Sequence, residues 1–371
     1  METRNIKPHL LPILGAIAGD VIGAPYELKG CRIKTTDFPL FCEKSTFTDD
    51  TVLTLAIAKW ICNQQSDLVK IVHDLGKKYI NVGFGHGFKV WLRDENPKPY
   101  NSYGNGSAMR VSSVAVSTND MVNVKWTAKQ TADITHNHTA GEIGAQAVAA
   151  AIYLAYNGFS KLIIKDFIEH YYYNLDGEID EIRKTYQFDA SCPGSVPQAI
   201  LAFLESDSVE HAIRLAVSLG GDADTQASIA GAIAAAYYKT IPNQILDYVL
   251  GILPEDLNVI IRQFNDFIPQ ESNHWNVALE SRKEFVLHCN FEGIYRDFVL
   301  PPSTRMEILS KNKNIEIRLL NNFKEVKEGL MQIYDLYFSE IYRGWLTPCL
   351  YINKEDLDNF VVRELTLEDI L

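Results

Sequence analysis

The sequence predicts an all-α protein, a compact orthogonal multi-helix bundle, with a small C-terminal α+β appendage. Through about the first 270 of 371 residues, small and apolar residues recur at helical spacing. Residues 145–155 and 227–236 are apolar almost all round, so these helices belong at the centre of a bundle. The composition changes after about Pro269, where strand-like segments begin. We therefore expect two domains, residues 1–270 and 271–371.

The elements follow in order along the chain. The most apolar of the expected helices cover residues 10–22, 51–61, 68–80, 140–156, 209–219 and 225–238. Glycine- or proline-rich segments are expected to form loops between them, at residues 82–87, 97–106 and 193–197. In the second domain, residues 284–290 and 315–320 have strand character, and residues 322–342 have helical apolar spacing.

The first expected helix needs a separate interpretation, because basic residues and an apolar run at residues 10–18 superficially resemble a signal peptide. Asp20 and Glu27 follow at once in a Gly/Ala-rich helical pattern, so we interpret it as the first core helix. No uninterrupted apolar stretch reaches the roughly 18 residues that a transmembrane helix needs. We therefore expect no membrane span.

Charge and cysteine content limit the classes of function. Lys plus Arg number 35 and Asp plus Glu number 47, which gives a net charge of −12. This acidic balance, without a dense basic run, disfavours a nucleic-acid partner. The six cysteines lie far apart without a CxxC pair, so they form neither a disulfide framework nor a zinc pattern. Free thiols predict a cytoplasmic location.

Two short acidic segments give the strongest indication of chemistry. One expected helix opens with Thr48, Asp49 and Asp50, and another opens with Asp222, Asp224 and Thr225. For either segment alone, helix capping is the alternative explanation. However, a helix needs only one cap, and four carboxylates converging in an Ala-rich core would repel each other unless neutralised. Carboxylate and hydroxyl oxygens suit Mg²⁺ or Mn²⁺, and two such ions about 4 Å apart could share these ligands.

A third acidic element is the pair Asp20 and Glu27. The two residues are seven positions apart, so they share a helix face if the helix continues. Pro25 favours a break near the helix end, which would leave Glu27 at a helix terminus. The alternative for Glu27 is an exposed side chain beside that helix end.

Two glycine-rich segments and a histidine pair complete the candidate site. Backbone N–H groups of residues 82–87 and 102–106 can hold a phosphate, although neither segment matches a Walker A loop or GxGxxG. Ordinary loops are the alternative. His136 and His138 have no third His or Cys nearby, so ligand contact or capping is favoured over a zinc site.

Taken together, these segments resemble the ADP-ribosylglycohydrolases, the family of dinitrogenase reductase-activating glycohydrolase and the ADP-ribosyl-acceptor hydrolases. The resemblance covers about residues 10–270. It depends on segments in the same order and approximate spacing: GAIAGDVIGAPYE, FTDDT, GFG, SYGNGSAMR, THNH and GGDADT. Ser107 stands where members often carry Gly. Residues 271–371 lie outside the resemblance.

The resemblance implies an all-α fold with a cleft that holds two Mg²⁺ ions, with Mn²⁺ as an alternative. The implied metal ligands are Thr48, Asp49, Asp50, Asp222, Asp224 and Thr225. Glu27 takes the place of a glutamate near the metals and the scissile bond. The implied contacts to ADP-ribose are Gly83, Phe84, Gly85, Ser102, Tyr103, Gly104, Asn105, Gly106 and His136, with Ser195 and Val196 on the adenine side.

The expected function is therefore hydrolysis of the ribose C1″ glycosidic bond in ADP-ribosylated substrates, with release of ADP-ribose. Glu27 or a metal-bound Asp, Asp49 or Asp50, would serve as acid or base. The expected partners are ADP-ribose, ADP-ribosylated proteins and a protein that binds residues 271–371. Three alternatives stay open: hydrolysis of free ADP-ribose conjugates or another nucleoside-like glycoside, capture of ADP-ribosylated proteins or blocking of a transferase without turnover, and a structural, crystallin-like role.

Overall fold

The computed structural model describes residues 6–63, 67–117 and 121–267, together with six strands between residues 273 and 353. The chain divides into two compact units, Met1–Gln270 and Glu271–Leu371. In the described part of the first unit, all regular elements are helices, and one isolated bridge joins Gly104 to Ser191. The predicted all-α fold of this region is confirmed.

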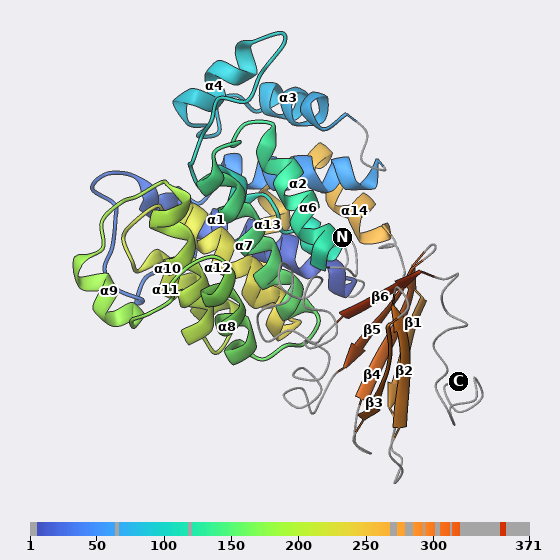
Figure 1. The fold of residues 1–371 in the computed structure, drawn as a ribbon. Coiled ribbons are helices and arrows are strands. Elements are labelled where there is room, and N and C mark those ends of the chain that lie inside the picture. Colours follow the sequence, from blue (N-terminus) through green and yellow to red (C-terminus); the bar gives the residue numbers. More distant parts are fainter. Residues whose placement is uncertain are drawn as a thin grey trace. The chain divides into compact units, whose positions relative to one another are not determined.

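The helices of the first unit are drawn and labelled in Figure 1. The α-helices are α1 (Leu11–Glu27), α2 (Asp49–Cys62), α3 (Leu68–Lys78), α4 (His86–Arg93), α5 (Gly106–Met109), α6 (Met121–Asp133), α7 (Thr139–Tyr156), α8 (Lys161–Tyr171), α9 (Ile179–Thr185), α10 (Cys192–Glu205), α11 (Val209–Val217), α12 (Ala223–Tyr238), α13 (Asn243–Ile252) and α14 (Glu255–Asp266). Two short 3₁₀ turns, η2 (Pro8–Leu10) and η3 (Val114–Val116), complete them.

The centre of the first unit is the pair α1 and α12, which pack through small residues (Figure 1). Gly15, Gly19 and Gly23 recur every four residues and so lie on one face of α1. A Cβ added to Gly19 would lie 2.0 Å from the carbonyl oxygen of Ala227 on α12, so the two backbones are in contact. This close packing places the C-terminus of α1 beside the N-terminus of α12.

Helix α1 continues through Pro25, so the break expected there is absent. Pro25 lies in the last turn, where its missing N–H removes one hydrogen bond and no further turn depends on it. Glu27 is still the last helical residue, as expected. Pro8–Glu27 is long and apolar enough to cross a membrane, but 89% of its most apolar window is buried inside the protein, as in a core helix.

The loop expected at residues 193–197 is instead the start of helix α10. Ser191 caps this helix by accepting a hydrogen bond from the Gly194 N–H at 3.1 Å. Pro193 occupies the first turn, where a missing N–H costs nothing and the fixed φ angle suits a helix. The prolines therefore mark a helix start here, and the loop prediction was wrong because it took them as breakers.

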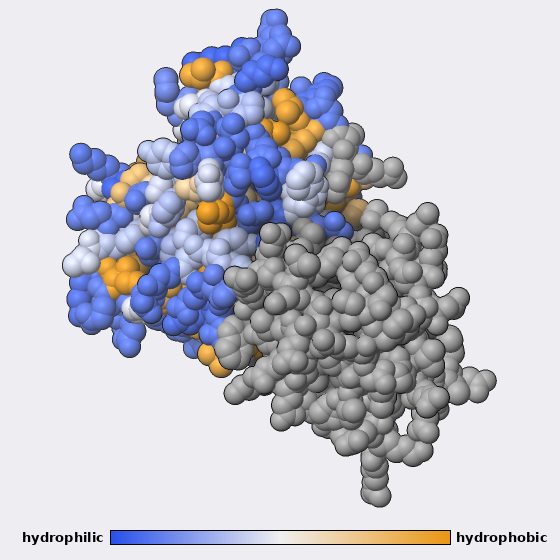
Figure 2. Space-filling model, in the orientation of Figure 1, coloured by the Kyte–Doolittle hydropathy of each residue, from blue (hydrophilic) through white to orange (hydrophobic). Residues whose placement is uncertain are grey.

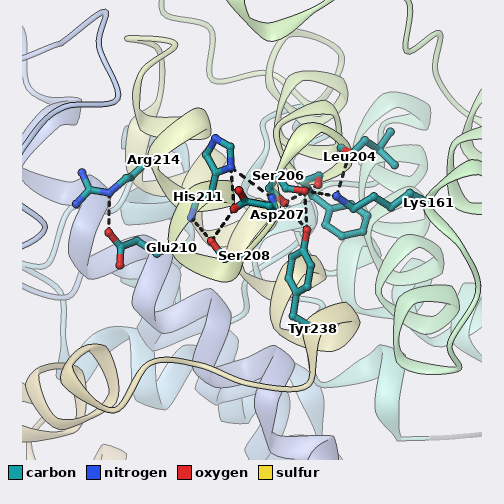
Figure 3. A network of polar contacts seen from close by, with 10 residues as sticks. Lys161, Leu204, Ser206, Asp207, Ser208, Glu210, His211, Arg214 and Tyr238 are labelled. Atoms are coloured by element: carbon teal, nitrogen blue, oxygen red, sulfur yellow. Dashed lines mark hydrogen bonds and ion pairs between the residues drawn. The ribbon is translucent and has the colours of Figure 1, made fainter.

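A polar network ties α8, α10 and α12 together, and Figure 3 shows it next to the local contacts at the start of α11. The Lys161 ammonium at the start of α8 donates to the carbonyl oxygens of Leu204 (3.0 Å) and Ser206 at the end of α10. The Tyr238 hydroxyl of α12 donates to the same Ser206 carbonyl at 2.6 Å. These bonds satisfy carbonyl groups that a helix end leaves without partners.

The second unit contains antiparallel strands. A four-stranded sheet has the order β1 (Asn273–Ala278), β4 (Arg305–Lys311), β5 (Asn314–Leu319) and β6 (Cys349–Asn353), and β2 (Phe285–Phe291) pairs with β3 (Ile294–Leu300). Strands β2 and β5 fall on the two segments predicted as strands. The helix predicted at residues 322–342 lies outside the described residues.

Candidate active site

A cavity of about 370 Å³ opens where the N-termini of α2 and α12, the C-terminus of α1 and four loops meet. Fourteen of the residues predicted for the site line it: Glu27, Thr48, Asp49, Asp50, Gly83, Gly85, Ser102, Gly104, Asn105, Gly106, His136, Asp222, Asp224 and Thr225. These residues come from segments up to about 200 positions apart in the sequence. The fold thus brings the acidic segments and both glycine loops to one place.

The carboxyl groups form a tight cluster at the floor of the cavity. One ligand oxygen each of Glu27, Asp222 and Asp224 lies within 4.8 Å of the others. Asp50 is 3% exposed, and its Oδ2 is buried without a hydrogen-bond partner among the described residues. A buried carboxylate oxygen without a partner is costly, so it calls for a cation or a proton.

The two acidic segments differ in how they cap their helices. Thr48 caps α2, because its hydroxyl accepts a hydrogen bond from the Asp50 N–H at 3.3 Å. Asp222 occupies the cap position of α12 but makes no capping hydrogen bond. Its Oδ2 instead accepts from the Asn105 side-chain amide at 2.8 Å. Capping therefore explains Thr48 and not the carboxylates, which are held toward the cavity.

Asp20 has a structural role that sequence reasoning did not assign. Its carboxylate is fully buried and accepts from the N–H and hydroxyl groups of both Thr48 and Thr51. The bonds from Thr48 are 2.9 Å (N–H) and 2.7 Å (hydroxyl). Asp20 thus fixes α1 to the first turn of α2, and this contact sets the position of Asp49 and Asp50. The signal in the sequence was an acid inside an otherwise apolar helix.

Burial and mutual repulsion disfavour the charged form of these acids. Burial raises the pKa of Asp49 to about 7, and the charge of Asp20 adds to this shift. Burial also raises the pKa values of Asp50 and Asp224 well above the usual range, and neighbouring carboxylates raise them further. The pKa of Glu27 rises for the same reasons, burial first and Asp222 second. A divalent cation would relieve this repulsion, so the donor set fits hard metal ions.

His136 places a neutral ring at the glycine loop, because burial holds its pKa well below the usual range. The Thr135 hydroxyl accepts from Arg110 at 2.9 Å and lies 2.7 Å from His136 Nδ1. The other ring nitrogen, Nε2, is 3.3 Å from where a Cβ of Gly106 would lie, so it faces the loop.

Four residues predicted to contact the ligand are not in the lining of this cavity. Phe84 is 2% exposed and stacks on the lining residue Phe88 with ring centroids 5.0 Å apart, so it packs behind the residues that line the cavity. Tyr103 is 57% exposed and lies outside the lining. Ser195 and Val196 are fully buried within α10. The Ser195 hydroxyl accepts from the Asn105 amide at 3.1 Å and so helps to position that amide.

The rest of the lining consists of Leu53, Gly87, Phe88, Tyr100, Met109, Phe188 and Ala190. Gly87 ends the segment 82–87 that was expected to hold a phosphate, and the other six were not predicted as site residues. Leu53 lies in the helix expected at residues 51–61, and Phe88 lies in α4, which was not predicted. Tyr100 and Phe188 stand in loops that have no periodic pattern. Nothing in the sequence pattern alone indicates these two aromatic residues.

Comparison with known proteins gives a consistent result. The sequence model of the family described as ADP-ribosylglycohydrolase matches residues 12–273. Among curated proteins, ADP-ribosylhydrolase ARH3 of Mus musculus is 27% identical over 319 residues, which cover 63% of this chain and 85% of that protein. ADP-ribosylarginine hydrolase Tri1 of Pseudomonas putida is 26% identical over 262 residues, which cover 61% of this chain and 69% of that protein.

A solved structure, that of an ADP-ribosylglycohydrolase-related protein complex, is similar in fold. It aligns with a TM-score of 0.54 and 22% identity over 70% of this chain and 97% of that one. The match of the sequence model ends at residue 273, next to the boundary between the two compact units.

Proposed function

The chain belongs to the ADP-ribosylglycohydrolase family, and from that premise we propose that it hydrolyses the bond between the distal ribose C1″ and the acceptor group of an ADP-ribosylated substrate. Its relatives by name are ADP-ribosylhydrolases, so it is an enzyme of this kind. The observation that carries the proposal is the convergence of Asp49, Asp50, Asp222 and Asp224 on one cavity beside Glu27. The expected products are free ADP-ribose and the unmodified acceptor.

We propose that two Mg²⁺ ions, or Mn²⁺ in their place, bind between the two helix N-termini. Thr48, Asp49 and Asp50 would hold them from α2, and Asp222, Asp224 and Thr225 would hold them from α12. The partnerless Asp50 oxygen and the raised pKa values of the cluster support this assignment. Bound there, the ions would supply positive charge for the ribose hydroxyls and for an attacking water.

The side chains of the protein would transfer the proton and hold the site in position. Glu27 lies at the end of α1, half-buried, where its carboxyl can accept a proton from water or deliver one to the leaving group. Asn105 holds the Asp222 carboxylate in place, and Asp20 holds Thr48. The first contact joins α12 to the start of α5, and the second joins α1 to α2, which lowers the cost of orienting the bound ribose.

Neutral donors would hold the diphosphate, since no lysine or arginine lines the cavity within the described part of the chain. Helix α4 begins at Gly85 without a side-chain cap, so N–H groups of its first turn remain available to an anion. Nε2 of His136 faces Gly104 and Gly106, and we propose that it carries the ring proton and so provides a further donor. We propose that these groups bind the phosphates, which lets an acidic protein hold an anionic ligand.

A binding module without turnover is the main alternative, and the complete carboxylate set argues against it, because a binder has no need of six buried or half-buried acids. We further propose a cytoplasmic location, since Cys31, Cys42, Cys62 and Cys192, the cysteines of the described helical part, are unpaired. We also propose that residues 271–371 bind a protein partner.

The test is release of ADP-ribose from defined conjugates, with and without Mg²⁺ or Mn²⁺, after removal of endogenous metal. Metal-dependent release from at least one conjugate is the expected result. Tight ADP-ribose binding with no release from any conjugate would favour the binding module, and release that survives exhaustive chelation would remove the metal assignment.

A further inference from the structure

The rim of the cavity next to Glu27 carries a cation that the proposed reaction does not use. Arg32 follows α1 in an exposed segment, and its guanidinium lies over the ring of Phe188, with the central carbon 4.1 Å from the ring centroid. Phe188 lines the cavity. The Arg32 Nε–H donates to the backbone carbonyl of Glu27 at 3.0 Å. One side chain thus connects the residue proposed for acid–base catalysis to an aromatic wall.

This position is fixed by neighbouring contacts. The Lys34 ammonium donates to the carbonyl oxygens of Tyr186 and Leu219, both at 2.6 Å. Tyr186 is in the loop that carries Phe188, and Leu219 is three residues before Asp222. The segment after α1 is therefore fastened to both the aromatic wall and the acidic loop, so Arg32 is held at the rim.

The charge of Arg32 is held beside the site, since its side chain contacts both Glu27 and Phe188. No arginine and no lysine lines the cavity in the described ranges, but Arg32 contacts two residues that do, Glu27 and Phe188. If the proposed reaction takes place next to Glu27, the group attached to C1″ therefore meets the positive charge of Arg32 there.

The proposal rests on the function proposed above and names its substrate class. We propose that Arg32 and Phe188 form a charge filter that favours ADP-ribose linked to a neutral hydroxyl and disfavours ADP-ribose linked to an arginine side chain. An arginine acceptor would bring a second guanidinium beside Arg32, and like charges repel. It would also find the Phe188 face, on which a guanidinium stacks well, already occupied by Arg32. A hydroxyl acceptor meets neither obstacle.

The experiment compares two small conjugates that differ in one charge, ADP-ribose on N-acetylserine amide and on N-acetylarginine amide. Wild-type protein, Arg32→Ala and Arg32→Lys are measured for kcat/KM on both, and affinities are measured by calorimetry on metal-chelated protein. The control is Lys29→Ala, which removes the same charge from an exposed lysine of the same segment that does not line the cavity.

The expected result is a change in the ratio of the two conjugates. Arg32→Ala should shift the ratio of kcat/KM, and of affinity, toward the arginine conjugate by roughly two- to fivefold, the size of an exposed charge interaction. Arg32→Lys should retain most of the wild-type ratio, and added salt should reduce the difference. Lys29→Ala should leave the ratio unchanged.

Three results would overturn the filter: an unchanged ratio in Arg32→Ala, an equal change in Lys29→Ala, or a wild-type preference for the arginine conjugate. A loss of affinity for free ADP-ribose with a constant ratio would place Arg32 on the diphosphate instead. If the wild-type protein cleaves neither conjugate, the proposed reaction fails on these substrates, and the ratio of the two affinities still decides for or against the filter.

Discussion

At the residue scale, the six acids near the cavity have different tasks, although burial disfavours ionisation of all of them. Asp20 is satisfied by four hydrogen bonds from Thr48 and Thr51, so it needs no cation. Asp50 has an oxygen without a partner among the described residues, and Asp222 turns away from the helix that it opens. Hydrogen bonding, more than burial, therefore separates the acid that positions from the acids proposed to bind metal.

Glu27 is expected to act in turnover more than in binding. Changing Glu27 to Gln keeps the size of the side chain and removes its ability to exchange a proton. We expect ADP-ribose affinity to stay within about tenfold and single-turnover release to fall by roughly 10²–10⁴, the usual size of an acid–base contribution. Glu181→Gln, the same change on a side chain that is 67% exposed, is the control. Unimpaired release by Glu27→Gln would transfer the acid–base role to an aspartate.

Asp222 is expected to act through the metal. In Asp222→Asn the remaining oxygen can still accept from Asn105, so the geometry is kept while one charge is lost. We expect the Mg²⁺ affinity to fall by roughly ten- to a hundredfold, and we expect excess Mg²⁺ to restore part of the activity. The metal-free variant should melt at a higher temperature than the metal-free wild type, because one repelling carboxylate is gone. Calorimetry with Mg²⁺ and thermal unfolding with chelator measure the two effects.

The matched control for this experiment is Asp74→Asn, on a side chain that is 61% exposed and paired with Lys70. It should change neither Mg²⁺ affinity nor the effect of chelator. Equal metal affinity in Asp222→Asn and wild type would contradict the ligand assignment.

The cluster also predicts an unusual dependence of stability on pH. The folded-state pKa values of Asp49, Asp50, Asp222, Asp224 and Glu27 are raised, that of Asp49 to about 7. The folded state therefore holds protons that the unfolded state has released, and the free energy of unfolding falls as pH rises through this interval. We expect metal-free protein to lose a few kcal/mol between about pH 5 and pH 8, since one pKa unit corresponds to about 1.4 kcal/mol.

Saturating Mg²⁺ should remove most of this slope, because the cation binds the deprotonated carboxylates. Urea unfolding at a series of pH values, with chelator and with Mg²⁺, measures both curves. A metal-free protein whose stability does not fall over the same interval would show that the pKa values of these acids are not raised in the folded state.

At the scale of elements, the site depends on how closely α1 and α12 approach. A Cβ on Gly19 would lie 2.0 Å from Ala227 O and 2.5 Å from Ser228 N, both backbone atoms that cannot rotate away. We expect Gly19→Ala to destabilise the protein by roughly 3 kcal/mol or more, with weaker Mg²⁺ binding, since α12 carries Asp222 and Asp224 at its start. Urea unfolding and metal titration measure the two losses.

Gly251→Ala is the contrasting variant. Gly251 lies in α13, and a Cβ there would meet nothing within 4 Å. This substitution should leave metal binding unchanged and stabilise the protein slightly, by up to about 1 kcal/mol, because Ala favours a helix. If Gly19→Ala behaved like Gly251→Ala, the backbones of α1 and α12 could separate without cost.

The elements that sequence predicted well are those whose pattern is local. Small and apolar residues at helical spacing identify α1, α2, α7 and α12, and paired acids at two helix starts identify the residues that the fold brings together in the cavity. The effects of two prolines were not predicted correctly. Helix α1 continues through Pro25, and Pro193 lies in the first turn of α10, where a loop was expected. Their effect depends on position within the helix, which the residue type alone does not give.

The parts of the site that could not be predicted depend on long-range contacts. Phe188 and Tyr100 line the cavity only because loops far apart in sequence meet there. Ser195 contributes through Asn105, 90 positions earlier, and Asp20 acts through Thr48. The exposure of large apolar side chains could not be predicted either. Figure 2 shows a mostly hydrophilic face of the first unit with separate apolar spots. Two of the exposed large apolar side chains, Leu28 and Phe188, belong to segments beside the cavity.

At the scale of the whole molecule, the first unit contains every residue assigned to the site. Its last helix, α14, covers part of its core and contacts the start of the unit. Helix α14 buries Leu257, Ile261 and Phe264. The Lys7 N–H donates to the Asn265 side chain at 2.9 Å, and His9 Nε2 lies 2.9 Å from the Phe264 carbonyl oxygen. The start and the end of this unit are thus joined without residues 271–371.

A chain that ends at Gln270 is therefore expected to fold, bind ADP-ribose and hydrolyse a small conjugate as the full-length protein does. A chain that ends before Glu255 lacks α14, exposes the apolar face that it covers and should not fold stably. Circular dichroism and single-turnover release compare the two with the intact protein. A folded chain of 270 residues without turnover would mean that residues 271–371 complete the site, whereas cleavage of small conjugates with loss of ADP-ribosylated protein substrates would mean that those residues select the target.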